Sequence, residues 1–191
     1  LWLELRQIIR EVGITTLHVT HNLEEAYSLG QRQSVMIDGS LVQSGDTREI
    51  FERPANESVA RYLNYTNIFE GVAEERHGET CIDLGQFGVQ VSARVAAGKR
   101  LKVCVWQPDL RRSKEGAAIK RSLKRNVFSG EFASLIPLRE EYVMWFKIEG
   151  SPKRYDLEAR FPLHMEGRHA LHEGKRIRVA LWEPMIMLFA E

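Results

Sequence analysis

Residues 98–110 read GKRLKVCVWQPDL, and the chain returns to nearly the same letters at residues 174–186, GKRIRVALWEPMI. Gly, Lys, Arg, Val, Trp and Pro are identical in the two stretches, and most of the other differences are conservative. A shorter pair supports the same repeat, because NIFEG at residues 67–71 matches NVFSG at residues 126–130. Self-similarity of this kind indicates two structural units of one ancestry.

The repeated region, residues 66–191, has the sequence texture of an all-β domain. Short strand-like runs alternate with glycine-containing breaks, and the copies occupy about residues 67–112 and 126–191, the second being longer. Each copy is near the lower size limit for a domain that folds alone, so we expect the two to share one core. Strands of this length are typical of small five-stranded OB-like barrels. The prediction is a duplicated, OB-like all-β domain.

Residues 1–65 carry a different pattern, which predicts an α/β region. Apolar residues at helical spacing predict a helix over residues 1–12, ended by Gly13. The β-branched run at residues 14–20 then predicts a buried strand. Because the first helix has a strongly apolar face, we expect it to pack against a core that lies N-terminal to this sequence.

Capping and turn residues define the rest of this region. Asn22 is placed to cap a second helix that Gly30 ends, and Glu25 stands at the reciprocal position of a capping box. The Asp38-Gly39 pair predicts the turn of a β-hairpin. Two short helices are predicted in the stretches DTREIFERP, which Asp46 caps, and NESVARYLN.

Composition and cysteine usage exclude some classes of protein. A net charge of +1 over 191 residues gives no general attraction to nucleic acid or to anionic membranes. No apolar run approaches the roughly 18 residues of a membrane span. Cys81 and Cys104 lack metal-ligand spacing, so we interpret them as reduced thiols of a cytosolic protein.

His21 is the residue whose position suggests chemistry. It follows the predicted strand 14–20 and precedes the predicted helix, at the edge where α/β sheets bind ligands. The N-terminus of a helix offers free N–H groups to phosphate, and a neutral imidazole can donate one ring N–H as well. The alternative, a histidine with only a capping or structural role, stays open on this evidence alone.

The stretch LHVTHNLEEAYSLGQRQSVMIDGSLVQSGDTREIFERPANESVARYL, residues 17–63, resembles the end of the nucleotide-binding subunit of ABC transporters. The resemblance covers roughly residues 1–65 and implies the end of an α/β ATPase domain. It also implies that His21 contacts the γ-phosphate of ATP across a closed dimer, beside Asn22. That family usually has Asp at the position of Asn22, so a charge next to the nucleotide is missing here.

The same resemblance shows which parts of the ATPase machinery this sequence lacks. No G-x-x-x-x-G-K-[ST] loop is present, and no strand ends in the acidic pair that holds Mg²⁺ and activates water. The resemblance implies ATP and Mg²⁺ as cofactors of a full-length protein only. We therefore expect this chain alone neither to bind ATP tightly nor to hydrolyse it.

The stretches CVWQPDL and ALWEPMIML resemble the closing segments of the transport-associated OB (TOBE) domain that follows some importer ATPases. The resemblance implies a role in dimer contacts and regulation. Trp106 and Trp182 stand where that family often has Arg or another residue before Pro. We interpret both tryptophans as core or interface aromatics.

Among importer ATPases, the sequence is most similar to those for molybdate, tungstate and sulfate. The KRNVFSG stretch resembles the entry of small molybdate-binding folds, and Lys124, Arg125 and Asn126 could offer charge and N–H donors to an oxyanion. Sugar, polyamine or iron importers are the alternative within the family. The resemblance implies a homodimer on the cytoplasmic face of the membrane, with permease subunits and, indirectly, a substrate-binding protein as partners.

Two other readings compete with this one. The stretch at residues 111–125 is rich in Lys and Arg, as in OB-fold modules that bind nucleic acid. It lacks interleaved aromatic residues, so we interpret it as a solvated linker and expect no nucleic-acid partner. A zinc site can be imagined in the stretch HMEGRHALH, which contains His164, Glu166, His169 and His172. Its spacing matches no standard pattern, so we expect no metal.

Overall fold

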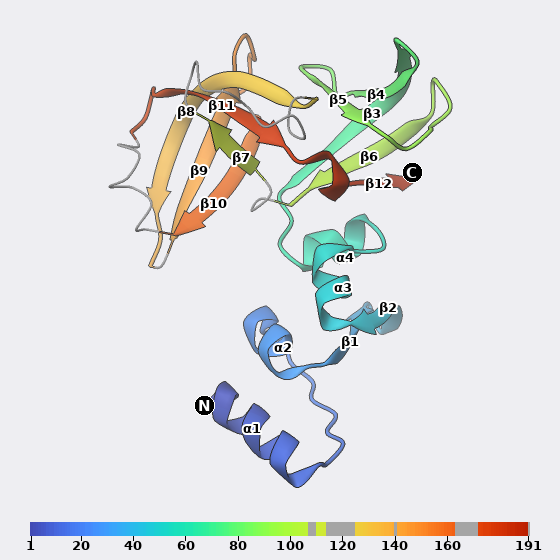
Figure 1. Cartoon of the computed structure of the whole chain (residues 1–191), viewed down its shortest axis with the longest axis vertical. Helices are drawn as coiled ribbons and strands as arrows, with labels where there is room; N and C mark the ends of the chain where they lie inside the picture. The colour runs from blue at the N-terminus through green and yellow to red at the C-terminus, as the bar shows by residue number, and fades with distance from the viewer. Residues whose placement is uncertain (107–109, 114–124, 140, 163–171, 191) are drawn as a thin grey trace. The chain divides into compact units, whose positions relative to one another are not determined.

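The computed structural model describes residues 1–106, 110–113, 125–139, 141–162 and 172–190 (Figure 1). The chain divides into two compact units, Leu1–Asn64 and Tyr65–Glu191. No helix among the described residues has both the length and the apolar character needed to cross a bilayer.

The first unit contains helices and one hairpin. Its elements are α1 (Trp2–Val12), α2 (Leu23–Leu29), β1 (Arg32–Ile37), β2 (Ser40–Asp46), α3 (Thr47–Glu52) and α4 (Glu57–Tyr62). Asp38 and Gly39 turn the hairpin with φ angles of 48° and 75°, the left-handed region that a type I′ turn requires. Asp46 accepts a hydrogen bond from the N–H of Arg48, so the predicted hairpin and this helix cap are confirmed.

The predicted strand at residues 14–20 is wrong for the described structure. These residues follow α1 as a segment without regular secondary structure, and they pair with no strand in the part of the molecule that the structure describes. Leu17 and Val19 are exposed by 92% and 88%. A strand depends on neighbours that satisfy its main-chain N–H and C=O groups, and β1 and β2 pair only with each other. The β-branched pattern alone therefore does not form a strand here.

The second unit is all-β, as predicted. Its strands are β3 (Asn67–Arg76), β4 (Glu79–Asp83), β5 (Gly88–Val91), β6 (Arg100–Val105), β7 (Leu110–Ser113), β8 (Val127–Pro137), β9 (Glu141–Ile148), β10 (Leu157–Pro162), β11 (Arg176–Leu181) and β12 (Ile186–Ala190). They form two five-stranded sheets, ordered β12-β6-β3-β4-β5 and β7-β11-β8-β9-β10. A short 3₁₀ helix, η4 (Glu183–Met185), precedes β12.

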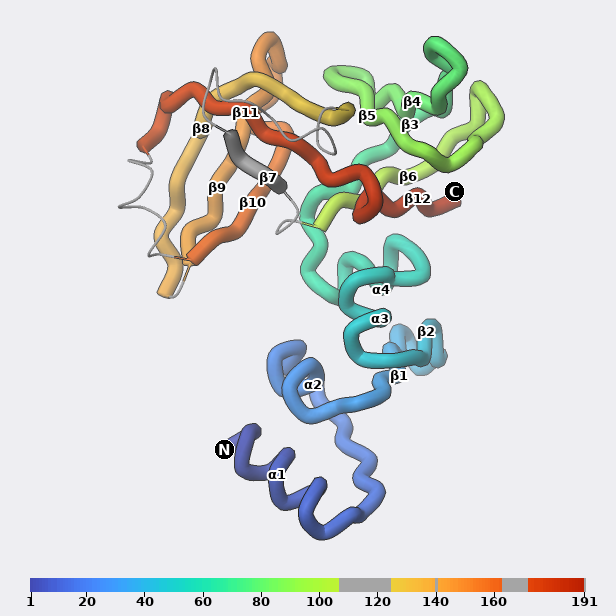
Figure 2. The backbone as a smooth tube through the Cα atoms, in the orientation of Figure 1, coloured from blue at the N-terminus to red at the C-terminus, as the bar shows by residue number. Residues whose placement is uncertain are grey.

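The two sheets have equivalent topology and exchange their last strands. Each sheet consists of four strands from one copy of the repeat and a fifth strand from the other copy. In the first sheet β12 pairs antiparallel with β6, and Figure 2 traces the two side by side. In the second sheet β7 pairs antiparallel with β11. Because each sheet is completed by the other copy, neither copy is a self-contained unit of pairing.

The repeated stretches occupy equivalent positions. Strands β6 and β11 share one burial pattern, with alternate residues inside and the last three buried. Before each strand stands a glycine with a left-handed φ, 81° at Gly98 and 78° at Gly174. The N–H of each glycine donates to a strand carbonyl, that of Ala73 or of Phe132, at 2.8 and 2.9 Å. The glycines of the repeat therefore serve the same turn in both copies.

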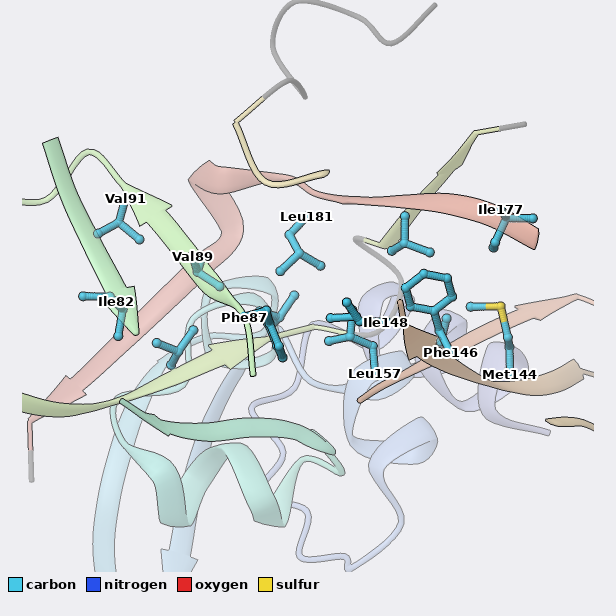
Figure 3. Packing of buried hydrophobic residues seen from close by; sticks show 14 of the residues in the cluster. Ile82, Phe87, Val89, Val91, Met144, Phe146, Ile148, Leu157, Ile177 and Leu181 are labelled. Atoms are coloured by element: carbon cyan, nitrogen blue, oxygen red, sulfur yellow. The ribbon is translucent and has the colours of Figure 1, made fainter. Parts of the chain in front are cut away.

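One hydrophobic core serves both copies, as expected from their size. The cluster joins residues of both sheets, among them Ile82, Val89, Phe146, Leu157 and Leu181 (Figure 3). Phe132 and Phe146 are the largest side chains that are fully buried. Because this apolar surface is shared, burying it stabilises both sheets together rather than each alone.

Candidate functional site

His21 lies between the irregular segment 14–20 and helix α2, and its side chain is exposed. The structure thus places it at the mouth of a helix, as predicted. It does not place it at the tip of a paired strand, because residues 14–20 form none.

Asn22 caps helix α2. Its side-chain Oδ1 accepts hydrogen bonds from the main-chain N–H groups of Glu24, at 3.0 Å, and Glu25, at 3.1 Å. The predicted N-cap is confirmed. Because these two N–H groups donate to Asn22, they are not the free donors to phosphate that the sequence analysis expected at the start of this helix.

The predicted capping box is wrong in its second half. Instead of reaching the N–H of Asn22, the Glu25 carboxylate accepts the hydroxyl of Thr20, with Oγ1 and Oε2 2.5 Å apart. The N–H of Asn22 donates to Thr20 Oγ1 at 3.0 Å. The hydroxyl of Thr20 therefore occupies the place that the Glu25 side chain takes in a standard capping box.

The charge of Glu25 is stabilised by its neighbours. The hydroxyl of Thr20, more than any other group, lowers the pKa of Glu25, and the imidazoles of His18 and His21 act in the same direction. Partial desolvation of the carboxylate opposes them. His18 Nε2 lies 3.3 Å from Glu25 Oε1. Sequence reasoning missed this role of His18 and Thr20, although their spacing before Glu25 would have been the signal.

Arg125, a predicted oxyanion ligand, lies among carboxylates. Its guanidinium is 2.9 Å from Glu79 Oε1 and 3.8 Å from Glu183 Oε2, and it lies 3.4 Å from the hydroxyl of Ser92. Glu183 also accepts the main-chain N–H of Ser92 at 2.7 Å. These contacts leave Arg125 largely neutralised in the described structure. Lys124 lies outside the described residues.

Asn126, the third predicted oxyanion ligand, is only 2% exposed and uses its whole amide on one neighbour. Its Oδ1 accepts the N–H of Gln90 at 2.7 Å, and its Nδ2 donates to the carbonyl of Gln90 at 2.9 Å. The roles of Lys124, Arg125 and Asn126 toward an oxyanion stay predictions. The described contacts of Asn126 are those of a structural bridge.

The remaining sequence candidates are placed only in part. Trp106 stacks on Tyr65 with ring centroids 6.3 Å apart, as expected of a packing aromatic. His172 is exposed, and its Nδ1 lies 2.9 Å from the carbonyl of Glu173. The other members of the imagined zinc set, His164, Glu166 and His169, lie outside the described residues, as does most of the basic stretch 111–125. Among the described residues no group of three His, Cys, Asp or Glu side chains could hold a metal.

Comparison with known proteins connects these features to a family. No family model matches the chain. The molybdate/tungstate import ATP-binding protein of Thermococcus kodakarensis is 42% identical over 128 residues, 67% of this chain and 36% of that protein. The spermidine/putrescine import ATP-binding protein of Oleidesulfovibrio alaskensis is 30% identical over 96% of this chain and 51% of that protein. This chain is homologous to the ATP-binding subunits of ABC importers.

The homology has a defined extent. The chain spans about a third of the length of the molybdate/tungstate relative and about half that of the polyamine relative. The molybdate/tungstate relative matches over the N-terminal two thirds of this chain, which includes the His21 loop, and the polyamine relative matches over 96% of it. The predicted family is therefore confirmed for this chain.

The fold of the β unit also has a solved counterpart. A crystal structure of the cytoplasmic molybdate-binding protein ModG with molybdate bound superimposes with a TM-score of 0.54. The alignment covers 66% of this chain and 97% of that chain at 16% sequence identity. At this identity the similarity concerns the fold alone, and it confirms the OB-like all-β class predicted for residues 66–191.

Proposed function

We propose that this chain is part of the ATP-hydrolysing subunit of an ABC importer whose cargo is an oxyanion such as molybdate, tungstate or sulfate. The observation that carries the proposal is the 42% identity to a molybdate/tungstate import ATP-binding protein over 128 residues. The ModG-like fold of the β unit supports it, because that neighbour holds molybdate in its crystal.

Within this function, residues 1–65 are the end of the α/β ATPase domain. Leu17 and Val19, which are nearly fully exposed here, alternate with polar residues and would lie on one face of a strand, as in a strand with one apolar face. We infer that this segment completes its pairing with strands of the ATPase domain. His21 then stands at the carboxyl end of a strand, where α/β sheets bind ligands.

His21 is the group that this chain contributes to ATP chemistry. Its exposed imidazole can donate one ring N–H to a γ-phosphate oxygen, which supports the proposed contact to the nucleotide. The described residues do not fit the other needs of the cofactors, because they contain no phosphate-binding loop and no set of carboxylates that could hold Mg²⁺. We assign no hydrolytic step to this chain alone.

The β unit is proposed to join two subunits into a homodimer and to regulate them. The assembly stands at the cytoplasmic face of the membrane beneath permease subunits, and it receives cargo through a substrate-binding protein. A duplicated fold with one shared core suits such a role, because a rigid domain can transmit a contact from one subunit to the next.

A chimera tests the ATPase assignment. The matching part of the Thermococcus kodakarensis protein is replaced by the N-terminal two thirds of this chain, and ATP hydrolysis is measured. We expect turnover in the chimera, and a loss of at least about tenfold after His21→Ala, as for removal of one contact to transition-state charge. Ser28→Ala, a change on the same helix, is the control. A folded chimera whose turnover survives His21→Ala would overturn the assignment of His21.

Ligand-dependent melting tests the cargo. The chain is melted with molybdate, tungstate, sulfate and chloride at matched ionic strength. An oxyanion at about 100 times its Kd adds about 2.7 kcal/mol to the free energy of unfolding, which shifts the midpoint visibly. A shift with one oxyanion and none with chloride supports cargo binding by the β unit. No shift with any oxyanion would remove cargo sensing from its proposed role.

A further inference from the structure

We propose that Glu25 is the positioning residue for His21: its carboxylate ties the loop that presents the imidazole to helix α2. The proposal rests on the function proposed above for His21 and adds the residue through which the loop is held. It begins from the main chain on the N-terminal side of His21. In the described structure, residues 14–20 belong to no sheet, so strand pairing does not fix where His21 stands.

The carboxylate of Glu25 contacts the loop through both of its oxygens. Oε2 accepts the hydroxyl of Thr20 at 2.5 Å, and Oε1 lies 3.3 Å from His18 Nε2. Glu25 itself is fixed in the first turn of α2, and its N–H donates to Asn22 Oδ1. One side chain thus connects two residues before His21 to the helix after it.

Thr20 passes this connection to the residue that follows His21. Its hydroxyl donates to Glu25, and its oxygen accepts the N–H of Asn22 at 3.0 Å. The hydrogen bonds therefore form a closed circuit from Glu25 to Thr20, to Asn22 and back to Glu25. His21 lies inside the sequence span of this circuit, and its exposed imidazole takes no part in the bonds.

The neighbouring Glu24 is a comparison for Glu25, because of the two carboxylates the described structure ties only that of Glu25 to Thr20. Both glutamates stand in the first turn of α2, where a negative charge interacts favourably with the helix dipole. Glu24 is exposed, and in the described structure only its main-chain N–H enters the circuit. Replacing Glu24 removes the same charge near the dipole without removing the tie to Thr20. Glu24→Ala is therefore the matched control for Glu25→Ala.

Backbone relaxation measured by NMR on the whole chain tests the proposal. In Glu25→Ala, we expect the order parameters of His21 and Asn22 to fall from about 0.85 toward or below about 0.6, the range of a flexible loop. In Glu24→Ala they should stay near the rigid value, as should those of strand β6 in both variants. Unchanged order at His21 in Glu25→Ala would overturn the proposal.

Substitutions at Thr20 separate positioning from a general loss of structure. Thr20→Val removes the hydroxyl at nearly constant shape and should loosen His21 as Glu25→Ala does. Thr20→Ser keeps the hydroxyl and should restore the order. The double variant Thr20→Val with Glu25→Ala should be looser than either single variant, but by less than the sum of their separate effects, because the Thr20–Glu25 hydrogen bond is lost in both. Additive loosening, or failure of Thr20→Ser to restore order, would contradict the circuit.

The chimera distinguishes failure of this inference from failure of the proposed function. If His21 contacts the γ-phosphate and Glu25 positions it, then Glu25→Ala lowers kcat while Glu24→Ala leaves it unchanged. A loss of order at His21 with undiminished kcat in both His21→Ala and Glu25→Ala would confirm the positioning and refute the ATP contact. A loss of kcat in His21→Ala with no change at all in Glu25→Ala would do the reverse.

Discussion

Asn67 and Asn126 make the same two hydrogen bonds at equivalent places in the two copies. Asn67 accepts the N–H of Glu158 at 2.8 Å and donates to its carbonyl at 2.7 Å, and Asn126 bonds Gln90 in the same way. Each side-chain amide copies the pairing of a neighbouring strand. Because Glu158 is on β10 and Gln90 is on β5, each bridge joins an edge strand of one sheet to the start of the other copy.

Because of these bridges, we expect substitution of either side-chain amide to lower the free energy of unfolding. Asn126→Asp keeps an acceptor for the N–H of Gln90 but loses the donor to its carbonyl, and it places a charge at a site that is 2% exposed. We expect the free energy of unfolding to fall by about 2 to 3 kcal/mol, the cost of leaving buried polar groups unpaired. Urea denaturation measures the change. Asn67→Asp should cost a similar amount.

The control for this bridge is Gln90→Ala. Only the main chain of Gln90 takes part in the two bonds, so this substitution should change stability by less than about 0.5 kcal/mol. A loss in Gln90→Ala as large as that in Asn126→Asp would show that the Gln90 side chain, not the bridge, supplies the stability.

Gly130 in β8 stands at a position that has no room for a side chain. A Cβ there would overlap the carbonyl oxygen of Lys147 and would lie 2.7 Å from the ring of Phe146. Because the obstacle is backbone, Gly130→Ala should lower the free energy of unfolding by about 3 kcal/mol or more. The neighbouring exposed Glu131→Ala should have little effect, and thermal melting compares the two. A stable Gly130→Ala would mean that strands β8 and β9 separate easily.

The position of Cys104 next to strand β12 predicts that this thiol becomes more reactive when β12 is disturbed. Cys104 on β6 is fully buried and stands opposite Met187 of β12. Met187→Ala should expose this thiol and speed its alkylation severalfold. Cys81 on β4 is the internal control, because β3 and β6 separate it from β12. Peptide mapping after brief alkylation gives both rates.

Truncation after Met185 is the stronger form of the same experiment. It removes β12, one of the two strands that pair with β6, so the amides of Arg100–Val105 that face β12 should exchange with solvent faster. The amides of β11 keep β7 and β8 as partners and should stay protected. Loss of protection in β11 before β6 would refute the exchange of strands between the copies.

The lowered pKa of Glu25 predicts an acid-sensitive loop. A carboxyl group whose pKa is lower in the folded state contributes stability above its unfolded pKa, and loses it as the pH falls through the folded value. As the pH falls through and below the usual glutamate pKa of about 4.3, hydrogen exchange at Glu24 and Glu25 should therefore accelerate beyond its intrinsic pH dependence. In Glu25→Gln this added step should be absent. An identical step in Glu25→Gln would assign it to another carboxyl group.

Much of the local structure followed from the sequence because it depends on neighbouring residues. Asn22 caps α2 and Asp38-Gly39 turns the hairpin through bonds and φ angles that span only a few residues. The similar stretches at residues 98–110 and 174–186 indicated two equivalent β copies. Their shared burial pattern follows directly from identical alternation along the strands.

Interactions between distant residues had to come from the tertiary structure. The predicted strand at residues 14–20 does not form, because its residue pattern does not supply the neighbouring strands that it needs. Asn126 was predicted to bind an anion because of its residue type and its basic neighbours in sequence, but in the structure it forms hydrogen bonds with the main chain of Gln90. A buried polar side chain forms hydrogen bonds with whichever unpaired polar group the fold brings next to it, and the sequence does not show which group that is.

By itself, the sequence determined the all-β class of residues 66–191, the repeat and the family resemblance, since composition and periodicity act locally. Only the tertiary structure decided that β7 and β12 change places and that Asn67 and Asn126 bridge to Glu158 and Gln90. The physical reason is that strand partners and buried hydrogen bonds are selected by competition among all the segments that the folded chain brings together.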